Sequence, residues 1–168
     1  MAGRVNNTFS VEDAHIMFRN FAGKETRFNQ AGKRNFCVEL TVAEADKLEA
    51  EGWNVKRREP REEGDPEFCY IQVSVSFDTI PPNIWLVTSH NKTRLNSQTV
   101  DILDYADIDR VDLVVRPYNW EVNGKHGVKA YVKNMYVTIV EDEFDKKYAD
   151  IPDGSTSDSA MDSEDVPF

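Results

Sequence analysis

The sequence lacks the features of several common protein classes. It has two cysteines among 168 residues, Cys37 and Cys69, and both lie in apolar runs, which favours buried reduced thiols over a disulfide. No apolar run approaches the roughly 18–20 residues that a membrane-spanning helix needs. Residues 1–7 lack the apolar stretch of a signal peptide. These absences predict a soluble cytoplasmic protein without a membrane partner.

The motifs of catalysis and cofactor binding are also missing. The three histidines and two cysteines show no zinc-ligand spacing, and there is no glycine-rich phosphate loop, nucleophile elbow or dinucleotide fingerprint. Cys37 has no histidine partner that the sequence identifies. The densest carboxylates of the body lack the glycine and terminal glutamate of a calcium loop: Asp101, Asp104, Asp107, Asp109 and Asp112. A solvated helix and turn explain them better than a magnesium-dependent nuclease, which stays an alternative. We expect no enzyme activity, cofactor or metal.

Acidic residues outnumber basic ones by 30 to 20, for a net charge of −10, which alone argues against a nucleic-acid partner. The excess is concentrated at the end of the chain. Residues 141–168 hold ten acidic residues and two lysines, a net −8, which leaves −2 for residues 1–140. Residues 153–159 carry no apolar side chain and predict disorder. We therefore expect a folded domain over 1–140 and a disordered acidic tail over 141–168.

The body has the alternation of β-strands rather than the period of helices. Thr41 and Glu44 form a capping box that predicts a helix through Ala50, with Gly52 as its stop. Thr99 or Ser97 caps a shorter second helix. Strands are expected at residues 14–18, 36–40, 69–77, 84–87, 113–122 and 128–140, with Phe18 and Phe36 on the core side. This order predicts a mainly β, OB-fold-like Greek-key barrel with one or two short helices, an architecture that binds oligonucleotides.

The last two strands carry the strongest functional signal. Asn123-Gly124 predicts a tight hairpin, and a two-residue turn pairs Tyr118 with Lys129 and Arg116 with Tyr131. Aromatic and cationic side chains then share one sheet face, as in platforms that stack bases and contact phosphates. The candidate DNA-binding residues of this hairpin are Arg116, Tyr118, Trp120, Lys125, Lys129, Tyr131 and Lys133. The alternative is that the aromatic rings belong to the core, and a three-residue turn would reverse the faces.

The first hairpin interleaves cations with phenylalanines in the same way. Its candidate DNA-binding residues are Arg19, Phe21, Lys24, Arg27, Phe28, Lys33 and Arg34. Phe21 and Phe28 are expected at an exposed loop end, where free bases of a single strand can stack on them. The alternative is a hairpin with ordinary surface lysines and packed phenylalanines.

Other basic and aromatic residues are weaker candidates. Lys92 and Arg94 lie in a predicted polar loop, and Phe68 and Tyr70 on the polar side of their strand. Residues 56–63 alternate in charge and are interpreted as a solvated loop. The predicted helix at 42–50 is acidic and should face away from phosphates.

The last residues resemble a known motif. The tip Asp162-Ser163-Glu164-Asp165-Val166-Pro167-Phe168 is similar to the acidic tip of bacterial single-stranded DNA-binding proteins, with Val166 where isoleucine is usual. In that family the tip docks into basic-rimmed pockets on replication and repair proteins. The resemblance therefore implies partner binding by Asp162, Glu164, Asp165, Val166, Pro167 and Phe168.

The body resembles the single-stranded DNA-binding proteins of bacteriophages. The resemblance lies in residues 18–21, 33–38 and 116–125. It implies a protein of phage DNA replication and recombination, in the cytoplasm of a bacterial host, that coats single strands without sequence preference. The tail would compete with DNA and recruit partners. The alternative is an acidic interaction module or DNA mimic that binds no nucleic acid. The family assembles as monomers, dimers or tetramers, so homo-oligomer formation stays open.

Overall fold

The computed structural model describes residues 4–60, 62–65, 67–78 and 80–141. The predicted tail disorder and the tip residues Asp162, Glu164, Asp165, Val166, Pro167 and Phe168 lie outside the described residues. Within the described part, none of the helices is long and apolar enough to cross a membrane.

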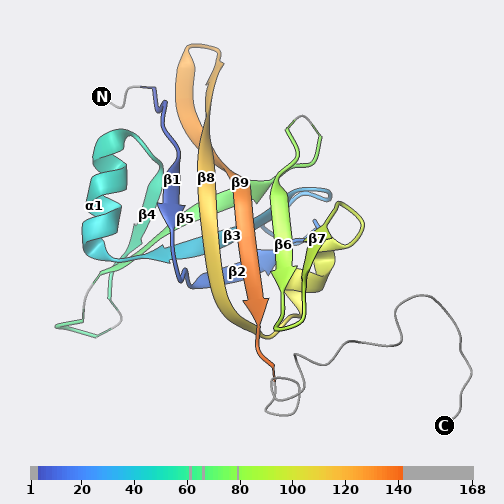
Figure 1. The fold of residues 1–168 in the computed structure, drawn as a ribbon. Coiled ribbons are helices and arrows are strands. Elements are labelled where there is room, and N and C mark those ends of the chain that lie inside the picture. The colour runs from blue at the N-terminus through green and yellow to red at the C-terminus, as the bar shows by residue number, and fades with distance from the viewer. Residues whose placement is uncertain (1–3, 61, 66, 79, 142–168) are drawn as a thin grey trace, which may run out of the picture.

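Strands dominate the structure, as the sequence predicts (Figure 1). The elements are β1 (Phe9–Val11), β2 (Ile16–Asn20), β3 (Arg34–Leu40), α1 (Val42–Glu51), β4 (Val55–Arg58), β5 (Phe68–Val75), β6 (Asn83–Val87), β7 (Lys92–Leu95), the 3-10 helix η1 (Val100–Asp104), β8 (Ile108–Val122) and β9 (Lys125–Ile139). The sequence analysis did not predict β1, β4 or β7. The expected second helix is the short η1, which Thr99 does not cap with its side chain.

The strands form one mixed sheet of nine strands whose main path runs β1-β8-β9-β5-β3-β2. β9 is parallel to β5 and β6 and antiparallel to β8. The two end strands, β1 and β2, follow each other in the chain, and Ala14 N between them donates to Val111 O of β8 at 2.7 Å. The sheet therefore curls into a partly open barrel, in agreement with the OB-like architecture expected from the sequence.

Alternate residues of the strands fill the interior of the sheet. Phe36, Val73, Val115 and Met135 are each fully buried, whereas most of their neighbours along each strand are half-buried or exposed. Cys37 and Cys69 are both free and buried, as predicted. The outer side of the curled sheet is thus left to polar, aromatic and charged side chains.

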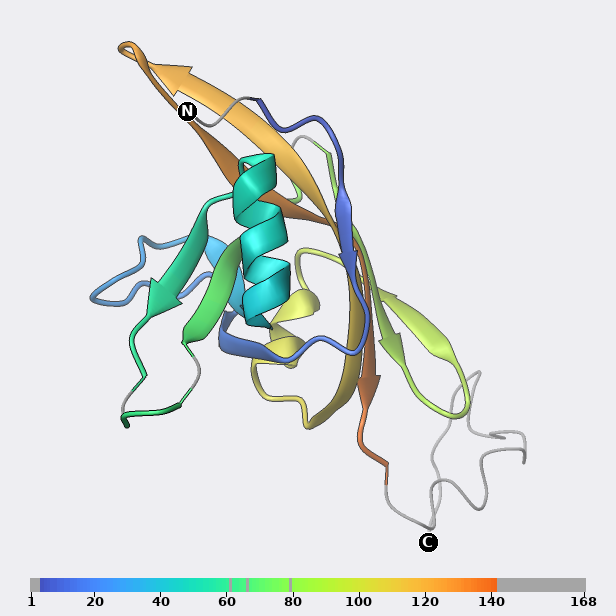
Figure 2. The ribbon, with the colours of Figure 1, turned by 90° about the vertical axis from the view of Figure 1, so that its left-hand side faces the viewer.

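Helix α1 covers one side of the barrel (Figure 2). Its predicted capping box is present: Glu44 N donates to Thr41 Oγ1 at 3.1 Å, and Thr41 N donates to Glu44 Oε1 at 2.8 Å. Gly52 ends the helix at φ 108°, a left-handed conformation that glycine adopts without steric cost.

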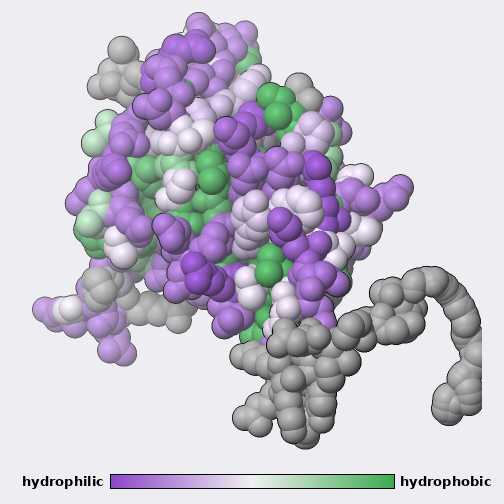
Figure 3. All heavy atoms as spheres, in the orientation of Figure 1, coloured by the Kyte–Doolittle hydropathy of each residue, from purple (hydrophilic) through white to green (hydrophobic). Residues whose placement is uncertain are grey.

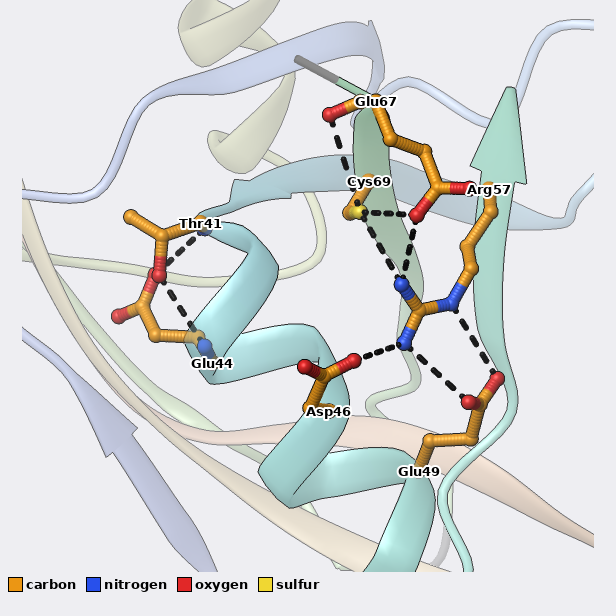
Figure 4. A network of polar contacts seen from close by, with 7 residues as sticks. All are labelled: Thr41, Glu44, Asp46, Glu49, Arg57, Glu67 and Cys69. Carbon is orange, nitrogen blue, oxygen red and sulfur yellow. Dashed lines mark hydrogen bonds and ion pairs between the residues drawn. The ribbon is translucent and has the colours of Figure 1, made fainter. Parts of the chain in front are cut away.

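Arg57 of β4 ties α1 to the sheet (Figure 4). Its guanidinium donates to Asp46 at 2.8 Å, to Glu49 at 3.2 Å and to Glu67 at 2.8 Å. The three carboxylates raise the pKa of Arg57 above its usual range. The interpretation of residues 56–58 as a solvated loop is therefore wrong, because these residues form a strand that an ion-pair network and pairing with β5 hold in place.

Hydrophobic side chains also reach the surface between α1 and the front of the sheet (Figure 3). An open groove there is lined by Phe9, Val11 and Leu48, together with Glu44 and Glu51 of α1. Carboxylates on its wall repel phosphates, so this groove does not suit nucleic acid.

Candidate nucleic-acid interface

The β8–β9 hairpin has the register that the sequence predicts. Asn123 and Gly124 form a two-residue turn at φ 53° and 80°, the positive angles that tight hairpin turns require. Tyr118 pairs with Lys129, and Arg116 pairs with Tyr131. The hairpin extends beyond the barrel as an arm (Figures 1 and 2).

Tyr131 lies at the centre of an aromatic and cationic cluster on the outer face of this hairpin. The Arg116 guanidinium lies 4.9 Å from the centre of the Tyr131 ring, and Lys129 Nζ lies 5.3 Å from it. The Tyr118 ring is 6.1 Å away and nearly perpendicular. Tyr118 is 52% exposed, so the alternative that it belongs to the core is wrong. We call Arg116, Tyr118, Lys129 and Tyr131 the Tyr131 cluster.

Further predicted residues of the hairpin extend this face. Trp120 is 38% exposed, and its ring lies against the backbone of Gly127, where a Cβ would come within 2.7 Å of the ring. Lys125 at the turn and Lys133 further along β9 are both exposed. Arg116 Nε is buried and makes no hydrogen bond to the described residues, so the cluster holds an unused donor.

The Tyr131 cluster continues onto the outer face of β5 and β3. Tyr131 pairs with Ser74 of β5, which in turn pairs with Asn35 of β3. Further along β5, Tyr70 and Phe68 point outward opposite Lys56 and Arg58 of β4, and the Arg58 guanidinium lies 5.2 Å from the centre of the Phe68 ring. The sequence analysis ranked Phe68 and Tyr70 as weak candidates and assigned both cations to a solvated loop.

Phe18 is on this outer face, and its predicted place in the core is wrong. The pairing of β2 with β3 shifts between Met17 and Asn20, and Phe18 has φ 53°. Such a bulge redirects side chains. As a result the Phe18 ring is 62% exposed and lies 6.4 Å from the Tyr70 ring. Positive φ is strained for a bulky residue, and strain of this kind concentrates at functional sites.

The loop between β2 and β3 forms one wall of an open groove beside this outer face. Phe28 is 92% exposed, with the Arg27 guanidinium 5.9 Å from its ring centre. Lys24 Nζ donates to the Tyr105 hydroxyl at 2.6 Å, and this contact raises the pKa of Lys24. Lys33 is also exposed. An open groove runs below this loop, lined by Phe18, Arg19, Asn20, Lys24, Thr26, Phe28, Asn29, Asn35, Cys37, Gln72, Asp104 and Tyr105.

Three predicted contact residues of this hairpin make contacts within the protein. Phe21 is fully buried and stacks on Phe36 with ring centres 5.1 Å apart, so its predicted exposure is wrong and it has no free face for a base. Arg19 donates to the carbonyls of Leu103 and Ala106 at 2.8 and 2.9 Å. Arg34 donates to the carbonyls of Phe21 and Ser97 at 2.7 and 3.0 Å. The two arginines therefore support the loop and η1.

Two of the five carboxylates weighed for a nuclease accept hydrogen bonds from the backbone. Asp104 accepts from Phe21 N at 2.6 Å and Ala22 N at 3.0 Å, and Asp112 accepts from Asp13 N at 2.8 Å. Across the residues that the structure describes, no three His, Cys, Asp or Glu side chains are grouped as metal ligands. The local geometry thus assigns Asp104 and Asp112 structural roles.

The sequence and fold were compared with known proteins. A family model described as "putative phage ssDNA-binding domain" matches residues 2–168. The solved single-stranded DNA-binding protein from bacteriophage Enc34 is 9% identical, with a TM-score of 0.50 over 82% of this chain and 83% of that chain. The same protein in complex with ssDNA is also 9% identical, with a TM-score of 0.49 over 82% and 89%. The gp2.5 protein of bacteriophage T7 is 11% identical, with a TM-score of 0.39 over 92% and 99%. No curated protein matches the sequence. At 9% identity, the likeness to the Enc34 protein with a TM-score of 0.50 concerns the fold alone.

Proposed function

This chain belongs to the phage single-stranded DNA-binding domain family, and from that premise we propose that it binds single-stranded DNA, without sequence preference, on the outer face built around Tyr131. The observation that carries the proposal is the Tyr131 cluster, where two rings and two cations share one outer sheet face. Every base has a π-face that can stack on such rings, and every nucleotide has a phosphate for the cations. Binding of this kind does not depend on base identity.

The shape of the surface favours a single strand over a duplex. Phe28 and Phe18 expose their rings around an open groove, and only unpaired bases can leave their stack to reach them. The outer face presents a curved sheet and loops, whereas duplex readers fit a helix or ribbon into a groove.

The proposal divides the residues into two roles. The stacking residues are Phe18, Phe28, Tyr118, Trp120 and Tyr131. The phosphate-contacting residues are Lys24, Arg27, Lys33, Arg116, Lys125, Lys129 and Lys133. Arg19, Phe21 and Arg34 hold the loop that carries Phe28.

Fluorescence anisotropy of a labelled dT oligonucleotide tests this function. Tyr131→Ala should weaken binding by about 5- to 150-fold, the range of roughly 1–3 kcal/mol per stacked base. Tyr131→Phe keeps the ring and should bind nearly as the unchanged protein does. Thermal unfolding of both variants separates lost contacts from lost folding.

Two results would contradict the proposal. The first is unchanged DNA affinity in a folded Tyr131→Ala protein, and the second is equal displacement of the oligonucleotide by duplex and single strands. Absence of any DNA binding would instead favour the acidic interaction module.

We further propose that residues 142–168 regulate this surface and that the protein acts in phage DNA replication and recombination. The tail shares the negative charge of DNA, so both compete for the same cations. The apolar tip Val166-Pro167-Phe168, flanked by Asp162, Glu164 and Asp165, supplies the chemistry for docking onto a basic-rimmed pocket of a partner protein.

A further inference from the structure

A second group of aromatic and cationic side chains lies on β6, β7 and the last part of β9. Trp85 of β6 pairs with Arg94 of β7 on one side and with Tyr136 of β9 on the other. Lys92 Nζ lies 4.7 Å from the centre of the Trp85 ring and 5.9 Å from that of Tyr136. We call Trp85, Lys92, Arg94 and Tyr136 the Trp85 cluster. The Tyr131 cluster shares none of these residues.

The Trp85 cluster faces solvent. Several of the residues next to it along the strands are buried: Ile84 on β6, Leu95 on β7, and Met135 and Val137 on β9. Tyr136 is 42% exposed, and Lys92 and Arg94 are exposed. The core is therefore complete on the other face of the sheet.

The charges around the cluster favour an anionic ligand. One carboxylate, Asp112, pairs with Tyr136 in the strand register. Asp112 is neutralised by Arg110 at 3.2 Å and also accepts from Asp13 N. Glu141 is bound to Ser89 through the backbone N at 2.6 Å and the hydroxyl at 2.8 Å. Lys92 and Arg94 have no ion-pair partner among the described residues.

One continuous strand connects the two clusters. Tyr131, Lys133 and Tyr136 all lie on β9, and Lys133 is exposed between the two tyrosines. At roughly 3.3 Å per residue, the five steps from Tyr131 to Tyr136 span about 16 Å. A DNA strand that covers this distance needs more than one nucleotide. The ~4–16 nucleotides that one OB-fold binds are enough to cover it.

We propose that the Trp85 cluster is a second contact site for the same DNA strand, occupied only by strands long enough to run from Tyr131 past Lys133. Bases stack on Trp85 and Tyr136, and Lys92 and Arg94 contact phosphates. The inference rests on the proposed function and adds a length dependence to it.

The experiment compares dT oligonucleotides of about 6 and about 16 nucleotides, each titrated with the full chain. Trp85→Ala should weaken binding of the longer oligonucleotide by about fivefold or more and leave the shorter one unchanged. Tyr131→Ala should weaken both. Trp85→Phe, which keeps a ring, is the matched control and should retain most of the affinity.

Trp85 is half-buried, so a second variant guards against misfolding. Lys92→Gln with Arg94→Gln changes exposed side chains. It should lower the slope of log affinity against log salt by about 1.4 for the longer oligonucleotide, at ~0.7 per phosphate contact. The charge control Lys47→Gln lies on α1 and should leave the slope unchanged.

The outcomes separate the two proposals. If the unchanged protein binds neither length, the proposed function fails. If it binds both, and the Trp85 and Lys92/Arg94 variants show no loss or an equal loss at both lengths, this inference alone is overturned.

Discussion

Three phenylalanines near the first hairpin show what decides whether a single aromatic ring is exposed for stacking on a base. Phe21 is fully buried, Phe18 is 62% exposed and Phe28 is 92% exposed. The sequence predicted Phe28 correctly because it lies in a polar loop. Alternation failed for Phe18 because one extra residue in a bulge changes the face of everything beyond it. Phe21 sits just past that bulge, where its burial depends on packing against Phe36.

Phe18→Ala should reduce DNA affinity without destabilising the fold. The exposed ring contributes little to the core, and its loss removes a stacking partner worth roughly 1–3 kcal/mol. Phe18→Gly should unfold at an equal or higher temperature than Phe18→Ala, because φ 53° costs glycine little. Anisotropy and thermal unfolding measure the two effects. A large stability loss with unchanged DNA affinity would assign Phe18 to the core.

Cys37 reports on the groove through its reactivity. Burial raises the pKa of its thiol, and only the thiolate reacts with alkylating reagents. Alkylation should therefore be slow at neutral pH and accelerate as the pH rises above the usual thiol range. Bound oligonucleotide should slow it further, since Cys37 lines the groove. Mass spectrometry of alkylated peptides gives the alkylation rates, and the more buried Cys69 serves as the internal comparison. Equal alkylation rates of Cys37 with and without DNA would place the strand outside this groove.

Among the strands and turns, the sequence predicted those features that depend on the conformation of a few neighbouring residues. The Asn123-Gly124 turn fixed the register of the longest hairpin because both residues adopt positive φ, a requirement visible in two letters of sequence. β4 and β7 escaped prediction because each is four residues long and rich in charge. Their strand conformation comes from pairing with β5 and β6 and, for β4, from Arg57 contacts to residues distant in sequence.

Gly124→Ala should destabilise the protein by about 1 kcal/mol, since a side chain at positive φ costs roughly 1–2 kcal/mol. The added Cβ meets no atom within 4 Å, so backbone strain is the sole local cost. Gly124→Asn should cost less, because asparagine tolerates this conformation. Urea unfolding measures both variants. If alanine and asparagine cost the same, conformational strain does not set the stability of the turn.

At the scale of the whole molecule, charge is divided between a nearly neutral body and a strongly acidic end. Residues 1–140 carry a net −2 against −8 for residues 141–168. Glu141, the first residue of the acidic segment, is bound to Ser89 of the body. The division into a folded domain and an acidic tail stays a prediction from composition, whereas the contact of Glu141 with Ser89 is a long-range one that composition does not encode.

Ending the chain after Glu141 should tighten binding to single-stranded DNA, on the order of tenfold at low salt. The gain should shrink as salt rises, because screening weakens the attraction of the tail for the cations. Anisotropy titrations across ionic strength test this. A tail of the same length with its carboxylates changed to amides separates charge from bulk, and it should bind as the shortened protein does. Equal affinities at all salt concentrations would exclude tail competition.

The three tryptophans occupy three different environments, and this gives the protein built-in optical probes. Trp53 is buried, with its ring 4.7 Å from that of Phe9, Trp85 lies beside Lys92, and Trp120 lies on the hairpin arm. Variants that keep one tryptophan each would separate emission from the core, from the β6–β7 side and from the arm. One titration of each variant would then show which part of the surface responds to a bound strand.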